Sequence, residues 1–267
     1  MSRNIYKKVK IGDITQGSII SGAISDVYGD TNVFGVVISA RCAIAQKKVR
    51  SYHYIPMVPF SKWKEIDFVR LCVEKATKEY RGKIKNILKS NGLSERVVED
   101  FEPSIILQKL SDKISTRTKE QLTEYVNHLS ELTTRRYSLV DTNTPYIEKF
   151  KKDILKALVK HEYVDYYLVE GWPQNQEQYY VLLLQEIKSI PNEIFFQLSH
   201  GLESVKIREV QSRCDLSTRT ENDLYFVHSQ IMSPYIEHII QRFYHNFGRI
   251  GIDDLSIEAT ISELNII

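Results

Sequence analysis

The sequence predicts an α+β fold in which a small β-barrel is interrupted by a long α-helical insertion and followed by a C-terminal helix. Residues 1–61 are rich in short β-branched and apolar runs, whereas residues 62–161 place apolar residues at a spacing of three and four. Residues 162–267 return to strand-like runs and then carry an amphipathic helix. Long runs of one element type favour α+β over α/β. We therefore divide the chain into a first half of the barrel (1–61), a helical insertion (62–161), and a second half of the barrel with the C-terminal helix (162–267).

The first 60 residues predict four strands, at 9–14, 18–25, 33–39 and 51–60. Residues 28–32 combine Gly, Asp and Asn, which is typical of a turn. The fourth strand contains Pro56 and Pro59. Because proline has no N–H to donate to a neighbouring strand, we expect this strand to lie at an edge of the sheet or to end near Pro56.

The middle of the chain predicts helices. Apolar residues from Ile66 to Ile87 lie on one helical face, and shorter helical patterns cover 95–101 and 104–111. Another helix is expected from Thr118, where Thr118 and Gln121 have capping-box spacing. The next should begin at Thr144-Pro145, with Thr as N-cap and Pro at the first helical position.

The last part of the chain predicts strands at 163–169 and 178–190, a short helix at 192–199, and strands at 205–210 and 224–229. Ser233-Pro234 then opens an amphipathic helix that is expected to end at Gly248. The two strand-rich ends are expected to pair into one sheet, so that the helices form an excursion from it.

Composition limits the class of protein. Lys plus Arg total 36 and Asp plus Glu total 34, giving a net charge of +2, which disfavours a sequence-specific DNA binder. Three cysteines argue against a disulfide framework, and neither a signal peptide nor a membrane-crossing apolar run is apparent. We therefore expect a cytoplasmic protein that does not bind a membrane. No metal or cofactor motif is apparent, so we expect no cofactor and no metal.

A basic stretch follows the third predicted strand. Lys47, Lys48, Arg50 and His53 lie close to the aromatic Tyr52. Single-stranded nucleic acid is bound by cations that contact phosphates and by rings that stack on bases, so these five residues are candidate nucleic-acid-binding residues. The alternative interpretation is a solvated connection of a hairpin.

A second polar set lies near the C-terminal strands and includes Arg208 and Arg213. Arginine side chains brought to one phosphate would stabilise the charge that develops during phosphoryl transfer. The alternative is ordinary polar surface between two strands.

The order of several motifs resembles the MazF/PemK type of toxin. The chain has Gly12-Asp13-Ile14, a Val-rich strand that ends at Ser39, and Val58-Pro59-Phe60-Ser61. A segment rich in Arg and Asp at 207–215 and a closing helix follow. The resemblance covers the two strand-rich ends and implies an SH3-like β-barrel and cleavage of single-stranded RNA.

The resemblance also implies a catalytic set. Ser61 matches the family's Ser or Thr after the Pro, whereas the family's basic residue before the Val-rich strand has no counterpart in residues 30–35. Arg41 or Arg50 would take its place, and Arg208 and Arg213 would contact phosphates. The implied partners are single-stranded RNA, an antitoxin or defence-system protein, and a second copy of the chain. The missing basic residue and the foreign insertion favour an alternative, a catalytically silent regulatory or protein-interaction subunit of a bacterial defence complex.

Overall fold

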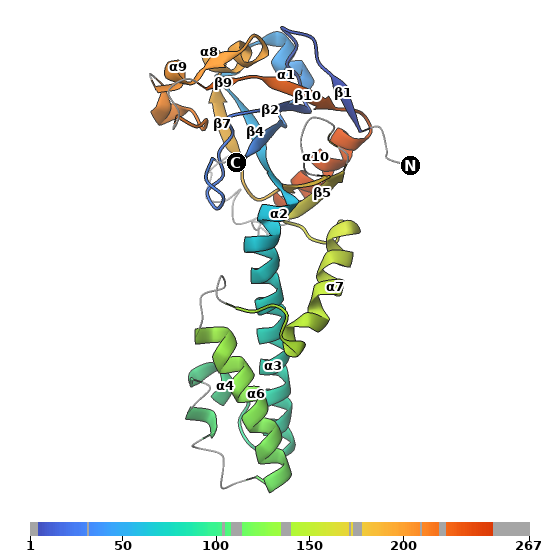
Figure 1. The fold of residues 1–267 in the computed structure, drawn as a ribbon, viewed down its shortest axis with the longest axis vertical. Helices are drawn as coiled ribbons and strands as arrows, with labels where there is room; N and C mark the ends of the chain where they lie inside the picture. Colours follow the sequence, from blue (N-terminus) through green and yellow to red (C-terminus); the bar gives the residue numbers. More distant parts are fainter. Residues whose placement is uncertain are drawn as a thin grey trace, which may run out of the picture.

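The computed structural model describes residues 5–30, 32–102, 105–107, 114–134, 140–170, 172, 178–208, 210–218 and 223–247. The chain is α+β, as predicted, and consists of a curled antiparallel half-barrel sheet with several helices (Figure 1). None of the described helices combines the length and the apolarity that crossing a bilayer requires.

The main sheet has eight strands, in the order β1-β10-β2-β3-β4-β6-β5, and β7 also pairs with β4. All of its pairs are antiparallel. Its strands are β1 (Tyr6–Lys8), β2 (Ser18–Ile20), β3 (Phe34–Val37), β4 (Ser51–Pro59), β5 (Tyr166–Glu170), β6 (Tyr179–Leu183), β7 (Lys188–Pro191) and β10 (Val227–Ile231). Strands from both ends of the chain therefore lie side by side. β1 and β5 end this order, and β7, whose pairing in the described residues is with β4 alone, forms a further edge. A separate pair joins β8 (Leu202–Glu203) to β9 (Leu224–Tyr225).

The prediction that residues 51–60 form an edge strand or end near Pro56 is wrong. β4 is central, with β3 on one side and β6 and β7 on the other. It pairs with β7 through Tyr54 and with β6 from Met57 onward, so Pro56 lies opposite the break between these two strands. A proline, which has no N–H, is tolerated there because neither of these strands needs a backbone hydrogen bond from that position.

Three further predictions of strands need correction. The predicted strand at 9–14 is replaced by β1 at Tyr6–Lys8 and a turn in which the N–H of Asp13 donates to the carbonyl of Lys10 at 3.0 Å. The predicted strand at 178–190 is two strands, β6 and β7. Residues 224–229 are likewise divided, between β9 and β10.

Residues 205–210 were predicted as a strand, but Ser204–Arg208 form helix α9. The alternation of Val205 and Ile207 with Lys206 and Arg208 suggested a strand. In the structure Ser204 and Ile207 are buried while Val205 is exposed, and a spacing of three between buried residues fits a helix.

The middle of the chain forms a helical arm that extends away from the sheet (Figure 1). It leaves β4 through α2 (Phe60–Trp63) and a π-helical turn (Lys64–Phe68) that leads into the 22-residue α3 (Val69–Ser90), about 33 Å long. α4 (Val97–Asp100), α6 (Thr116–Thr134) and α7 (Pro145–Val159) follow, and α7 begins at the predicted proline. The predicted helix at 104–111 lies largely outside the described residues. The apolar face of α3 packs against those of α6 and α7, which buries the core of the arm.

Two apolar cores lie on opposite faces of the sheet. Ile19, Val36, Ile55 and Met57 face α10 (Tyr235–Phe247), the predicted C-terminal helix. Their neighbours in sequence, such as Ile20 and Tyr54, belong to the other core, because successive strand residues point to opposite faces. That second core continues into the arm. It also reaches α8 (Asn192–Phe195), the 3₁₀ turn Phe196–Ser199, and α9.

Candidate functional site

Arg41 lies on α1 (Arg41–Gln46), a short helix that replaces the predicted hairpin connection. Its Nη2 donates to Oε1 of Glu237 at 2.7 Å and to Oγ of Ser233 at 3.2 Å. The hydrogen bond from Ser233 and the interaction with Arg41 lower the pKa of Glu237. The charge of Arg41 is therefore already matched by a carboxylate at the start of α10.

The other cations of the basic stretch surround the connection from α1 to β4. Lys47, Lys48, Arg50 and His53 are all exposed. Lys47 ends α1 in the left-handed conformation, with φ of 53°, and its Nζ lies 4.8 Å from the ring centroid of Phe196. The structure thus places Lys47, Lys48 and Arg50 on one exposed connection, and the exposed His53 near the start of β4.

Tyr52, the fifth of these residues, needs correction. Its ring is fully buried and stacks on Phe195, with 4.1 Å between ring centroids. A buried ring cannot receive a base, so the aromatic platform that the sequence suggested is part of the core.

The four predicted catalytic residues are not brought together. Ser61 is exposed on α2, directly after β4, whereas α1 and Arg41 lie near the start of β4, where the N–H of His53 donates to Oγ of Ser39. The nine residues of β4 separate these two positions by about 26 Å. A single phosphate cannot be contacted from both.

Arg208 and Arg213 lie on helical segments beside β7 and β8, on α9 and on the 3₁₀ turn Gln211–Arg213. Both side chains are exposed, and Nη2 of Arg213 lies 3.6 Å from Oε1 of Glu193. Instead of flanking two strands, the two arginines lie on a short helix that contacts β8 and on a 3₁₀ turn that contacts β7.

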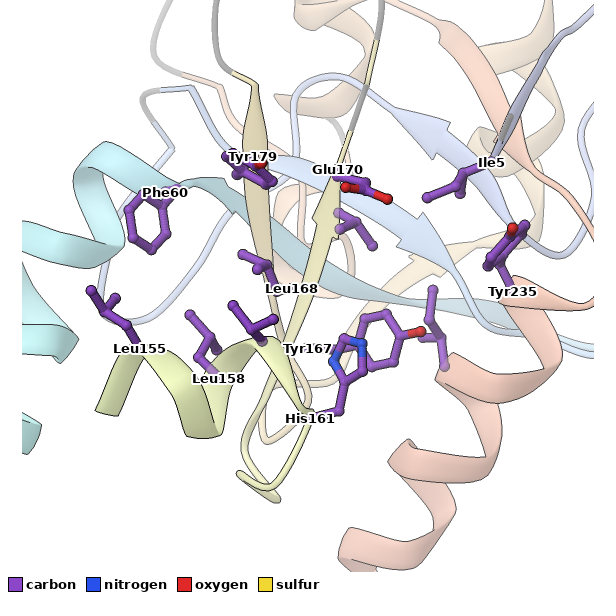
Figure 2. A pocket seen from close by; sticks show the side chains of 13 residues that line it. Ile5, Phe60, Leu155, Leu158, His161, Tyr167, Leu168, Glu170, Tyr179 and Tyr235 are labelled. Carbon is purple, nitrogen blue, oxygen red and sulfur yellow. The ribbon is translucent and has the colours of Figure 1, made fainter. Parts of the chain in front are cut away.

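An apolar pocket lies elsewhere, beside β5. Figure 2 shows a pocket of about 420 Å³ whose walls come from β5, α2, α7 and α10, together with Ile5. Phe60, Leu155 and Leu158 form one side, and Tyr235 lies on the other. Four consecutive residues of β5, Tyr167–Glu170, line it. Because alternate strand residues point to opposite faces, a pocket that contacts four in a row runs along the edge of the strand.

One wall of this pocket is held by aromatic and polar contacts. The His161 ring stacks on Tyr167, with 4.0 Å between centroids, and Oη of Tyr167 is hydrogen-bonded to Nδ1 of His238 at 2.9 Å. Nη2 of Arg242 donates to the carbonyls of His161 and Tyr163. These contacts join the connection between α7 and β5 to α10 along this wall of the pocket.

Reasoning from the sequence missed this pocket because its walls are distant in sequence. The sequence offered one signal, the apolar run Ala157-Leu158-Val159, which is wider than the single buried face of α7 requires. In the structure Val159 is 62% exposed and lines the pocket.

A buried polar network joins the sheet to the arm, and the sequence did not indicate it. Oη of Tyr28 donates to Oδ2 of Asp67 at 2.6 Å, and Nε of Arg70 donates to Oδ1 at 3.1 Å. Nη2 of Arg70 also donates to Oη of Tyr166 at 2.6 Å. Burial and the hydrogen bond to Asp67 raise the pKa of Tyr28. The π-helical turn places Asp67 inward, and π-helical turns within helices occur frequently at functional sites.

Within the described ranges, no three His, Cys, Asp or Glu side chains are grouped as a metal ion requires. Comparisons of the chain with protein families, curated proteins and solved structures find no match. The functional argument therefore rests on the geometry of the chain itself.

Proposed function

We propose that the chain is a catalytically silent interaction subunit that binds an extended, apolar segment of a partner protein along the edge of β5. The observation that carries this proposal is the apolar pocket that runs beside an outermost strand. An outermost strand offers backbone N–H and C=O groups on its outer side, and an added strand can pair with them.

The chemistry of the pocket defines the partner segment. Aliphatic side chains from α7 and β5 and the rings of Phe60, Tyr179 and Tyr235 favour branched apolar side chains. Backbone pairing would supply affinity, and the pocket would select those side chains on alternate residues of the segment.

The separation of the predicted catalytic residues supports a silent subunit over an endoribonuclease. Arg41 is engaged with Glu237, and Ser61 lies about 26 Å away along β4. We further propose that the curled sheet is a modified SH3-like barrel of MazF/PemK type, which is supported by the way strands from both chain ends combine in it. A role in a bacterial toxin–antitoxin or phage-defence system rests on this resemblance.

The experiment that tests the proposal has two arms. The purified chain is incubated with a panel of single-stranded RNAs, and we expect them to stay intact. The chain is also applied to an array of ten-residue peptides, and we expect it to retain peptides with alternating Ile, Val or Leu and to reject versions with Asp at those positions. The proposal would be overturned if the chain cleaves RNA and Arg41→Ala or Ser61→Ala abolishes that cleavage. It would also be overturned if the chain shows no preference for the apolar peptides on the array.

A second candidate function is the binding of single-stranded RNA without cleavage, favoured by the exposed cluster of Lys47, Lys48, Arg50 and His53. Binding through phosphates would weaken steeply as salt increases. Replacing Lys48 and Arg50 by Gln should then reduce both the affinity and its dependence on salt.

A further inference from the structure

The C-terminal tail, residues 248–267, is unusually apolar for a chain terminus. It contains eight Ile or Leu among twenty residues, namely Ile250, Ile252, Leu255, Ile257, Ile261, Leu264, Ile266 and Ile267. Segments that remain solvated are generally poor in such residues, because exposed branched side chains favour burial. The composition of the tail therefore favours its binding to an apolar surface.

The pocket at the edge of β5 is the matching surface, and the tail starts close to it. The tail continues directly from α10, and Ile239 of that helix lines the pocket. From Ile239 to the end of α10 at Phe247 is about 12 Å, whereas twenty extended residues span up to about 66 Å. The tail is therefore long enough to reach the pocket.

We propose that the tail occupies the β5-edge pocket of its own chain until a partner segment displaces it. This inference rests on the proposed function and adds its regulation, since the tail has the branched apolar chemistry that we assign to the partner. Binding in cis gives the tail a high effective concentration at the pocket, so a partner must compete with it.

The test uses the full chain and hydrogen exchange measured by mass spectrometry. In the tail-polar variant, all eight Ile and Leu are replaced by Asn or Ser. In its matched control, Ser256, Thr260, Ser262 and Asn265 are replaced by Gln. We expect the amides of Tyr166–Glu170 that do not pair with β6 to exchange about tenfold faster in the tail-polar variant than in the native chain, and at the native rate in the control. Equal exchange in the native chain and the tail-polar variant would overturn the inference.

The pocket side gives an independent readout. Val159→Lys places a charge in the pocket at an already exposed position, and Val205→Lys is the control at an exposed valine on α9. We expect Val159→Lys to accelerate cleavage of the tail by a glutamate-specific protease at Glu258 and Glu263, and Val205→Lys to leave it unchanged. Equal cleavage in the two variants would contradict the inference, as would tail protection that disappears on dilution, because the tail would then bind a second copy.

Failure of the inference and failure of the proposed function are distinguishable. A synthetic peptide of residues 248–267 is added to the tail-polar chain, with and without Val159→Lys. If Val159→Lys weakens binding of this peptide, the pocket is supported as a peptide site. If β5 is also unprotected in the native chain, only the inference that the tail occupies the pocket is overturned. Absence of binding to the tail-polar chain would overturn the tail's occupancy, and the peptide array would decide the proposed function separately.

Discussion

Two arginine–carboxylate pairs lie where helices join the rest of the fold, and their surroundings differ: Asp67 and Arg70 belong to the arm and bind Tyr28 and Tyr166, whereas Arg41 and Glu237 join α1 to α10. At the arm, the Asp67 side chain is 6% exposed, and Tyr28 and Arg70 both donate to it. At α1, Arg41 and Glu237 are 50% and 47% exposed. An exposed pair contributes little net free energy because water and salt screen it. Removing the buried Asp67 carboxylate would leave the buried Tyr28 hydroxyl without its acceptor, although Arg70 would keep Glu74 as a partner. An arginine–carboxylate pair should therefore contribute more to the free energy of unfolding at the arm than at α1.

The largest expected effect is at the arm. Asp67→Ala removes the acceptor for Tyr28 and for Arg70, and we expect the free energy of unfolding to fall by about 3 kcal/mol. Urea denaturation measures it. The matched control is Asp153→Ala, which removes a 65%-exposed partner of Lys75 and should cost less than about 0.5 kcal/mol. Similar losses for the two variants would contradict the contrast.

Acid should reveal a half-buried histidine in the sheet. Burial lowers the pKa of His228 to about 4, below its ordinary value of 6.5. The unfolded chain therefore binds a proton that the folded chain does not, and stability should fall by on the order of 2 kcal/mol as the pH drops from about 7 to 4. In His228→Phe, whose new ring would join those of Phe34 and Trp172, this part of the loss should disappear.

The control variant is His53→Gln, which replaces an exposed histidine of β4. Thermal denaturation followed between pH 4 and 7 compares the three chains. If His228→Phe loses as much stability at low pH as the native chain, protonation of His228 does not cause the loss.

A smaller effect is expected from Tyr28→Phe. This change deletes one buried hydrogen bond to Asp67 but leaves Arg70 in place, so we expect a loss of about 1 kcal/mol. If the arm network acts as one unit, Tyr28→Phe combined with Asp67→Ala should cost less than the sum of the two single changes.

The smallest effect is expected from Arg41→Ala. Because the ion pair with Glu237 is exposed, its removal should cost less than about 1 kcal/mol, and the difference from the native chain should vanish in 1 M salt. A loss as large as that of Asp67→Ala would show that α1 is held as firmly as the arm.

The sequence predicted the helices better than the sheet, for physical reasons. The long helix now assigned to α3 and the start of α7 at Pro145 follow from local spacing and from proline at a helix start. Strand partners are not local, so nothing near Pro56 indicated that β4 changes its partner from β7 to β6 at that point. Asp67 was missed because the π-helical turn shifts the register that a regular helix would have.

The candidate site was the least predictable part. The charged residues were identifiable by type, but the burial of Tyr52 and the distance from Ser61 to Arg41 depend on how β4 sits within the sheet. The pocket combines Ile5, Phe60, Leu155 and Tyr235, which only the folded chain brings together.

The most direct test of the central claim, that an added strand binds at the edge of β5, uses peptides with N-methyl groups. An antiparallel strand directs the N–H groups of alternate residues toward its neighbour. A peptide of residues 248–267 is methylated on the backbone nitrogens of its odd-numbered residues in one version and of its even-numbered residues in another. Affinity for the tail-polar chain should fall in only one version. Equal affinity of both versions and the unmethylated peptide would contradict strand addition at β5.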